Sequence, residues 1–586
     1  MSSLILNRPW SFRKPKEKLI SSLANSLDLP RSITAFLVNR GLCTRQSIED
    51  HLHSSLSSLT DPFVMKDMDR AVDRLATAVT TGEKIGIFGD FDADGVTAAA
   101  LLYLFLKEIG AKSEVYIPHR EKDGYGLNEQ GIDQLASSGC SLIVSVDCGI
   151  TNVQEAAYLS SKGLELIITD HHQPLDEMPQ AIARVNPKRK DCPFPFKELS
   201  GVGVAFYLSW ALRRRLIERG RFSKSGAPNL KKYLGLVAVG TVADMMPLYR
   251  ENRVMVKAGL EVLSRAPGPG LKAIMDSVGV SGKINCTDIG FRIGPRLNAA
   301  GRMHHAMTAF ELLTCQDERE ASRLASELEG FNQARQKLER RLLSQVLDML
   351  KTSGDRCAHV FYSDTWKKGI LGLVASKVVE QAKCPVILLA LDEGGLLAGS
   401  GRSPDEIDLF SAISACQDLF LRFGGHRTAA GLKMPLDNIE EFQRRFEEAV
   451  QAQALEKATP CVLELDMEVS MEELVTPRYV KCMEWLEPFG PGYQEPVFST
   501  RNFSVREARV VGKNHLKLLI SPVNGSVAPT TVSLLAWGHG SLLDLAWHEM
   551  EVAFSPSVNE WNGKKSLQLI LKDARRAPGG QVTRKT

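Results

Sequence analysis

The sequence lacks long apolar runs. In 586 residues no segment approaches the roughly 18 consecutive apolar residues that a membrane-spanning helix needs. The first residues, MSSLILNRPWSFRKPKEK, soon become polar and basic and contain no apolar core of signal-peptide length. Both absences argue against a helical membrane protein, and we expect a cytoplasmic location without a membrane partner.

Paired cysteines are also missing. The 11 cysteines are scattered singly, and no two of them form a C-x-x-C pair. An odd number of isolated cysteines argues against a disulfide framework and against a thiolate zinc site, so we expect reduced thiols, mostly in the core.

The chain has little excess of charge of either sign. Lys and Arg total 72 against 69 Asp and Glu, a formal net charge of +3, which is too small to demand a polyanionic partner. Two local basic clusters stand out, at 212–221 (LRRRLIERGR) and 572–586 (KDARRAPGGQVTRKT). Each is either a solvated face or a contact for nucleic acid.

The apolar runs that are present alternate with helical stretches. Short β-branched runs such as KIGIFGD, SLIVSVDCG and LELIITDHH are separated by segments of helical length and composition. This alternation predicts an α/β fold whose parallel sheet has helices on both faces. The length predicts several domains.

Changes of pattern give the predicted domain limits. A second α/β alternation begins near HVFYS, and Leu567, Leu569 and Leu571 show the period of two that is typical of a small antiparallel barrel or sheet. We predict an N-terminal helical region at 1–80, a first α/β domain at 81–305, a long connecting helix at 306–352, a second α/β domain at 353–455, a β domain at 456–575 and a basic tail at 576–586.

The segment GDFDADG carries Asp90, Asp92 and Asp94 directly after a predicted strand. It resembles a calcium EF-hand loop, but position twelve of such a loop would be Leu101 instead of glutamate, and a strand precedes it instead of a helix. Three carboxylates within five residues repel one another unless a cation neutralises them. The segment therefore indicates a shared metal site.

Further candidate ligands follow other predicted strands. Asp147 ends one strand, and Asp170, His171 and His172 end another. Since ligands bind at the carboxyl ends of parallel strands, these loops are expected to converge. Asp244 adds a carboxylate inside an apolar helical stretch. Oxygen and imidazole donors without thiolate suit manganese, magnesium or zinc, manganese above all. Two ions about 4 Å apart would activate water and polarise a phosphoryl oxygen.

An ordered series of motifs resembles a known superfamily. GDFDADG, VDCG, TDHH and GTVADMMPL, in this order, resemble the Asp-His-His (DHH) phosphoesterases. HREKDGYGL, GVGVAFYL, GPRLNAAGR, GSGRS, FGGHRTAAG and EPFGPGYQEPVF extend the resemblance over about residues 39–573 to its single-strand-specific 5′ to 3′ DNA exonucleases. Cys148, where many relatives have Asn, and His304 and His305 depart from the pattern.

The resemblance implies an architecture and roles for individual residues. It places a DHH catalytic domain at 81–305, a DHH-associated substrate-binding domain at 353–455 and an oligonucleotide-binding (OB) barrel at 456–575. It implies that Asp170 orients the site and that His172 lies near the scissile phosphate, both as catalytic residues. A two-metal site for Mn²⁺ or Mg²⁺ would be held by Asp90, Asp92, Asp94, Asp147, His171 and Asp244. Phosphate would be handled by Arg120, Arg296, Asn298, Arg302, Ser400, Arg402 and His426.

The favoured function is therefore hydrolysis of single-stranded DNA from its 5′ end to nucleoside 5′-monophosphates, in recombination and repair. A DHH phosphodiesterase for cyclic dinucleotides or short RNA, a pyrophosphatase, and a noncatalytic nucleic-acid-binding scaffold are the alternatives. The expected partners are single-stranded DNA, a helicase and a single-strand-binding protein, and the expected state is a monomer. Trp485, Trp537, Trp547 and Trp561 are either base-stacking residues or core residues.

Overall fold

The computed structural model describes residues 8–577 apart from 15, 355, 393, 455–461, 524–530 and 562. Contacts within the chain divide it into two compact units. The larger unit contains residues 60–246 and 255–459. The smaller contains residues 1–59, 247–254 and 460–586. No helix in the described ranges combines the length and the apolar character needed to cross a membrane.

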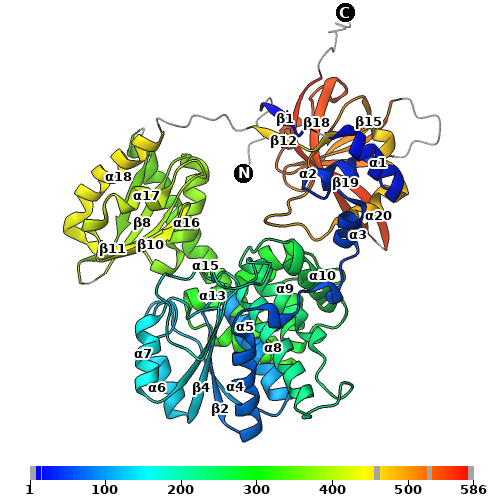
Figure 1. The fold of residues 1–586 in the computed structure, drawn as a ribbon. Coiled ribbons are helices and arrows are strands. Elements are labelled where there is room, and N and C mark those ends of the chain that lie inside the picture. Colours follow the sequence, from blue (N-terminus) through cyan, green and yellow to red (C-terminus); the bar gives the residue numbers. More distant parts are fainter. Residues whose placement is uncertain are drawn as a thin grey trace, which may run out of the picture. The chain divides into compact units, whose positions relative to one another are not determined.

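The larger unit begins with a five-stranded sheet in the order β3-β2-β4-β5-β6, and all neighbouring strands are parallel. Helices α4, α5 and α8 lie on one face and α6 and α7 on the other (Figure 1), as the alternating pattern predicts. The strands are β2 (Lys84–Phe88), β3 (Lys112–Tyr116), β4 (Cys140–Val146), β5 (Glu165–Thr169) and β6 (Ala183–Val185). The helices are α4 (Met68–Thr81), α5 (Ala93–Glu108), α6 (Glu129–Ser137), α7 (Val153–Ser161) and α8 (Gly201–Glu218).

Further helices connect this sheet to the second α/β part. They are α9 (Leu234–Ala243), α10 (Arg250–Arg265), α11 (Pro269–Ser277), α12 (Cys286–Asp288), α13 (Gly294–Met303), α14 (Met307–Thr314) and α15 (Glu318–Thr352), with a π-helical turn at Ile289–Ile293. The predicted connecting helix at 306–352 is wrong in one respect, because it is two helices. Asp317 starts the second by accepting a hydrogen bond from the Glu320 N–H at 2.8 Å, as an N-cap does. The resulting α15 is 35 residues long.

The second sheet of the larger unit has the order β10-β11-β9-β8-β7. Only β7 and β8 pair in parallel, and the other neighbours are antiparallel. Its strands are β7 (His359–Ser363), β8 (Val386–Leu391), β9 (Leu396–Arg402), β10 (Arg422–His426) and β11 (Ala429–Pro435). The accompanying helices are α16 (Lys368–Ala382), α17 (Leu409–Ser414) and α18 (Ile439–Ala454).

The smaller unit is built on a seven-stranded sheet in the order β13-β14-β18-β19-β17-β16-β15. The prediction of a small antiparallel barrel or sheet for this part of the chain is wrong in one respect, because β17 pairs with β19 in parallel. The elements are β12 (Leu463–Leu465), β13 (Met467–Glu468), α19 (Met471–Leu474), α20 (Pro477–Leu486), β14 (Phe498–Thr500), β15 (Phe503–Val511), β16 (His515–Pro522), β17 (Val532–Ala536), β18 (Met550–Trp561) and β19 (Lys564–Arg576).

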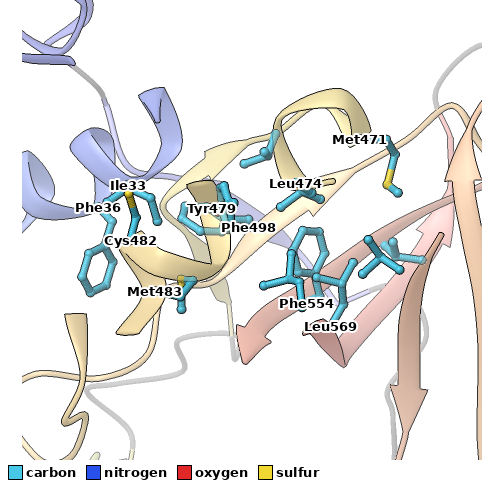
Figure 2. Packing of buried hydrophobic residues seen from close by; sticks show 14 of the residues in the cluster. Ile33, Phe36, Met471, Leu474, Tyr479, Cys482, Met483, Phe498, Phe554 and Leu569 are labelled. Atoms are coloured by element: carbon cyan, nitrogen blue, oxygen red, sulfur yellow. The ribbon is translucent and has the colours of Figure 1, made fainter. Parts of the chain in front are cut away.

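The first helices of the chain belong to the core of the smaller unit. They are α1 (Glu17–Leu27), α2 (Arg31–Asn39) and α3 (Arg45–Leu52), preceded by β1 (Trp10–Phe12), which pairs with β12. Ile33 and Phe36, three residues apart on one face of α2, lie beside Tyr479 and Cys482 of α20 (Figure 2). The described part of the predicted 1–80 region is thus shared between the units, since α4 belongs to the larger one.

Candidate metal and phosphate site

The loop after β2 presents its carboxylates through the start of α5. Asp92 is the N-cap and accepts hydrogen bonds from the N–H groups of Asp94 (2.9 Å) and Gly95 (3.0 Å). A side chain at Gly95 would bring a Cβ within 2.6 Å of the Asp90 Cβ, so glycine permits this tight turn. Asp94 accepts from the N–H groups at the start of α8, from Gly201 (2.6 Å) and Val202 (2.9 Å), where the helix dipole favours negative charge.

Asp147 follows β4 and has a left-handed backbone, with φ of 64°. Its carboxylate Oδ1 lies 3.1 Å from Nε2 of His171. Gly201 has no room for a Cβ, because that atom would overlap this carboxylate. The start of α8 therefore approaches both Asp94 and Asp147.

Asp170 organises the loop after β5. Its side chain accepts hydrogen bonds from the N–H groups of Ile150 (3.0 Å), His171 (2.7 Å) and His172 (3.0 Å), and it lies 2.8 Å from Nδ1 of His172. Although burial raises it, the hydrogen bond and charge of His172 hold the pKa of Asp170 below its ordinary value. Asp170 thus contacts the ring of His172 directly, and its role in orienting the site stays a prediction.

Asp244 completes the cluster from the C-terminal end of α9, with Oδ2 at 3.7 Å from Nε2 of His171. Three groups of side chains each offer ligand atoms within 4.8 Å of one another. The groups are Asp147 with His171 and His172, Asp94 with His171 and Asp244, and Asp90 with Asp92 and Asp147. All six residues expected as metal ligands therefore converge.

The cluster is electrostatically costly without a cation. Burial, followed by the neighbouring carboxylates, raises the pKa of Asp94 to about 7 and that of Asp244 to about 8. Burial and the same neighbours raise the pKa of Asp90 and of Asp147 well above their ordinary values. Two buried oxygens, Oδ1 of Asp90 and Oδ1 of Asp147, find no hydrogen-bond partner within the described part of the chain. These donors fit Mn²⁺ or Mg²⁺, which would neutralise the charges and occupy the unpaired oxygens.

Three arginines form a second cluster in the larger unit. Arg120 lies over the ring of Phe91 at 4.8 Å, Arg302 donates to the Gly369 carbonyl at 2.8 Å, and Arg402 donates to Oγ of Ser400 at 2.6 Å. Burial, followed by the charges of Arg120 and Arg335, lowers the pKa of Arg302 to about 9. Burial and Arg120 also lower the pKa of Arg402. Among the described residues none of the three forms an ion pair, so the cluster favours an anion.

The other residues expected at phosphate have different surroundings. Arg296 forms an ion pair with Glu329 at 2.7 Å, and Oδ1 of Asn298 accepts a hydrogen bond from the Ala93 N–H at 2.9 Å. His426 is exposed at the end of β10. Asn298 thus supports the start of α5, and a phosphate contact by these three residues stays a prediction.

Sequence reasoning overlooked Tyr125. Its hydroxyl lies 2.9 Å from Nδ1 of His172 and 3.4 Å from the Asp147 carbonyl oxygen. The sequence analysis used this residue only as part of the HREKDGYGL motif, although a tyrosine hydroxyl in that motif could have indicated a site residue. Cys148, the noted departure, is buried with Sγ 3.8 Å from the Phe88 carbonyl oxygen and lies outside the donor groups.

Comparison with known proteins agrees with this arrangement along the chain. Residues 84–241 match the model of the DHH family N-terminal domain, 354–452 the DHHA1 domain and 465–573 the RecJ OB domain. The sequence is 36% identical over 572 residues to the single-stranded-DNA-specific exonuclease RecJ of Bacillus subtilis, covering 96% of this chain and 70% of the relative. For RecJ of Escherichia coli the identity is 35% over 564 residues, with 93% and 96% covered.

The chain belongs to the RecJ family. Solved RecJ structures are similar over nearly the whole chain. RecJ of Thermus thermophilus in complex with Mn²⁺ has a TM-score of 0.79 and 31% identity, covering 97% of this chain and 80% of that one. Its Mg²⁺ complex has a TM-score of 0.73 and 30% identity, with 97% and 78% covered. The donor groups of this RecJ-family chain are suited to both of these metals.

Proposed function

We propose that this RecJ-family chain is a Mn²⁺- or Mg²⁺-dependent exonuclease that degrades single-stranded DNA from the 5′ end to nucleoside 5′-monophosphates. One observation carries the proposal: the larger unit contains both a buried carboxylate and histidine cluster and a group of arginines without ion-pair partners among the described residues. The first suits divalent cations, and the second suits phosphate oxygens.

In this proposal the six converging residues, Asp90, Asp92, Asp94, Asp147, His171 and Asp244, hold the cations. Bound there, divalent cations polarise a phosphoryl oxygen and lower the pKa of water. Asp170 accepts from Nδ1 of His172, which leaves Nε2 as the ring atom that donates to the scissile phosphate. Tyr125 limits the motion of the same ring through its hydroxyl contact.

Arg120, Arg302 and Arg402 would capture the terminal 5′-phosphate, with Ser400 as a further hydrogen-bonding group. A guanidinium presents a planar fork that matches phosphate oxygens. Because a phosphate at the 5′ terminus differs from an internal phosphodiester in charge, capture of the terminal group would determine which end of the strand enters. The 5′ to 3′ polarity follows from this capture.

The barrel would hold the trailing strand. Trp537 is the tryptophan best suited to stack on a base, since it is 54% exposed, whereas Trp547 is 3% exposed. Trp485 packs against His53, and the side chain of Trp561 lies outside the described residues. A barrel of this kind favours a polymer over the alternative substrates, a cyclic dinucleotide or short RNA. Delivery of DNA by a helicase or a single-strand-binding protein, a cytoplasmic monomer and a role in recombination and repair belong to the same proposal.

The test compares four substrates with Mn²⁺ or Mg²⁺: 5′-phosphorylated single-stranded DNA, duplex DNA, RNA and a cyclic dinucleotide. We expect the single-stranded DNA to be degraded fastest, with 5′-mononucleotides released first from the labelled 5′ end. Preferential hydrolysis of the cyclic dinucleotide, or release beginning at the 3′ end, would contradict the proposal.

A further inference from the structure

Helix α16 presents two glycines to the arginines of the larger unit. Gly369 and Gly372 are three positions apart, so they lie on one side of the helix. We name these two residues the glycine face. A glycine inside a helix is less stable than alanine, so Gly372 indicates that another group approaches the helix closely. Other positions of α16 pack into a hydrophobic cluster with β7 and β8: Ile370, Leu371, Val374, Ala375 and Val378.

The groups that approach Gly372 are the side chains of Ser400 and Arg402. A Cβ at position 372 would lie 2.7 Å from Nη2 of Arg402 and 3.1 Å from Oγ of Ser400. The first distance is too short for two atoms that are not bonded, so any larger residue at 372 would push the guanidinium away. The guanidinium therefore occupies space that only a glycine leaves open.

The Arg402 atom nearest Gly372 is also the donor that this side chain has left for a ligand. Nη1 is engaged, since it donates to Oγ of Ser400 at 2.6 Å and to the Gly401 carbonyl oxygen at 2.7 Å. Within the described ranges, Nη2 donates to no acceptor. A side chain at 372 would therefore act first on the atom that is available for a phosphate oxygen.

The first turn of α16 receives Arg302 in a similar way. Nη1 of Arg302 donates to the Gly369 carbonyl oxygen at 2.8 Å, and a Cβ at Gly369 would lie 3.1 Å from the Arg302 carbonyl oxygen. Burial, followed by the charge of Arg120, lowers the pKa of Arg302, and the charge of Arg402 lowers it further, as is expected of cations that lie near one another. The glycine face thus receives one arginine from α13 and one from β9.

We propose that the glycine face positions the arginines that capture the terminal 5′-phosphate, and that Gly372 is the positioning residue for Arg402. Without a side chain at 372, the guanidinium of Arg402 lies against α16 and keeps Nη2 available for a charge-assisted hydrogen bond. The inference rests on the proposed capture of the 5′-phosphate by the arginine cluster. It makes Gly372 a determinant of the preference for strands that begin with a 5′-phosphate over strands that begin with a 5′-hydroxyl.

The test is Gly372→Ala in the full chain, with hydrolysis of single-stranded DNA measured at saturating Mn²⁺. Because the added methyl group displaces Nη2 of Arg402, we expect KM on 5′-phosphorylated strands to rise about tenfold, less than the roughly 100-fold that a displacement of about 1 Å can cost. Capture of the terminal phosphate acts on bound substrate and transition state alike, so kcat should change less than about twofold. Strands with a 5′-hydroxyl should change less than about twofold in both constants, whereas a merely structural role would affect both kinds of strand equally.

Gly330→Ala is the matched control. Gly330 is a glycine within α15 of the same unit, and a Cβ there would meet nothing within 4 Å. Both variants gain the higher helix propensity of alanine, but only Gly372→Ala meets the guanidinium of Arg402. We expect Gly330→Ala to keep the preference for 5′-phosphorylated strands within about twofold of the wild type. A fall equal to that of Gly372→Ala would overturn the inference.

A double variant shows whether Gly372 acts through Arg402. In an Arg402→Gln background, Gly372→Ala should lower the preference for 5′-phosphorylated strands by less than about twofold more, because the group that the methyl displaces is already gone. A full additional tenfold loss would overturn the inference, since the methyl group would then act on something other than Arg402.

Gly369→Ala tests the same face at Arg302. The added Cβ presses on the Arg302 carbonyl oxygen, so we expect a severalfold loss of the preference for 5′-phosphorylated strands. Thermal unfolding of each variant shows whether it is folded, and if Gly372→Ala is not, Gly369→Ala decides the question. An unchanged preference in that variant would then overturn the inference.

The outcomes separate this inference from the proposed function. A folded Gly372→Ala with an unchanged preference for 5′-phosphorylated strands would overturn the inference alone. A wild-type protein that hydrolyses strands with a 5′-phosphate and with a 5′-hydroxyl equally well would overturn the proposed capture of the terminal phosphate as well.

Discussion

The two five-stranded sheets of the larger unit carry different kinds of functional group. The all-parallel sheet carries Asp90, Asp147 and His171 in loops at its strand ends, whereas the mixed sheet carries Ser400 and Arg402 on one strand, β9. Parallel strands direct several loops to one edge, so side chains far apart in sequence meet there. In a strand, residues two apart share a face, so Ser400 and Arg402 meet locally. The two sheet types thus bring functional groups together by different routes.

The carboxylate cluster and the arginine cluster therefore favour ligands of opposite charge. Burial and like charges raise the pKa of the carboxylates around Asp94 and lower the pKa of Arg302 and Arg402. A cation relieves the first cluster and a phosphate relieves the second. Changes to one cluster should therefore affect metal binding, and changes to the other should affect phosphate capture.

The largest effect is expected from a change in the carboxylate cluster. Asp147→Asn removes one negative charge, and asparagine tolerates the left-handed backbone of this position. We expect turnover to fall by about 10³-fold, or about 4 kcal/mol in barrier height, in single-turnover hydrolysis of 5′-phosphorylated single-stranded DNA. DNA binding by fluorescence anisotropy should change little. Near-normal turnover would mean that the acidic cluster is not the catalytic site.

Metal binding should also stabilise the folded protein. Mn²⁺ at 100 times its dissociation constant is expected to add about 2.7 kcal/mol to the free energy of unfolding, because it neutralises the buried carboxylates. Thermal unfolding with and without Mn²⁺ measures this. The gain should be reduced in Asp147→Asn and retained in Arg402→Gln, and an equal gain in both variants would remove the distinction between the clusters.

At the phosphate side, Arg402→Gln removes a charged donor but leaves the acidic cluster intact. Loss of a charge-assisted hydrogen bond of about 2 kcal/mol predicts a fall of roughly 30-fold in kcat/KM on 5′-phosphorylated strands. Strands that begin with a 5′-hydroxyl should lose much less, and Mn²⁺ affinity should not change. An equal loss on both kinds of strand would argue against capture of the terminal phosphate.

The smallest effect is expected in the smaller unit, which contains neither the carboxylate cluster nor the arginine cluster. Trp537 is exposed and meets the ring of His515 edge-on at 4.9 Å. Trp537→Ala should weaken binding of single-stranded DNA by about tenfold, in line with the loss of one stacked base, with little change in thermal stability. Trp547→Ala, a buried control, should instead destabilise the fold by about 3–5 kcal/mol.

Local patterns predicted the first sheet and its cluster well. The alternation of strands and helices places Asp90, Asp147 and His171 at one edge, and this needs only the rule for parallel sheets. Long-range pairing was harder. The pairing of Arg296 with Glu329 and the parallel pairing of β17 with β19 depend on contacts between distant segments, which no local spacing encodes.

The buried Arg253 shows the same limit most clearly. In sequence, Arg253 is one basic residue of PLYRENR, and no local pattern indicates that it is buried. Its burial depends on four carbonyl groups that lie more than 200 positions away and on the packing of helices from the start of the chain against α20. Only the folded unit brings these segments together.

The most direct test of the account is a crystal structure of the wild-type protein soaked in Mn²⁺, with manganese located by its anomalous scattering. We expect manganese bound by carboxylates of the GDFDADG loop together with Asp147, His171 and Asp244, and the same crystals of Asp147→Asn should show weaker occupancy. Manganese located only elsewhere, or an acidic cluster that stays free of metal at saturating Mn²⁺, would contradict the central claim.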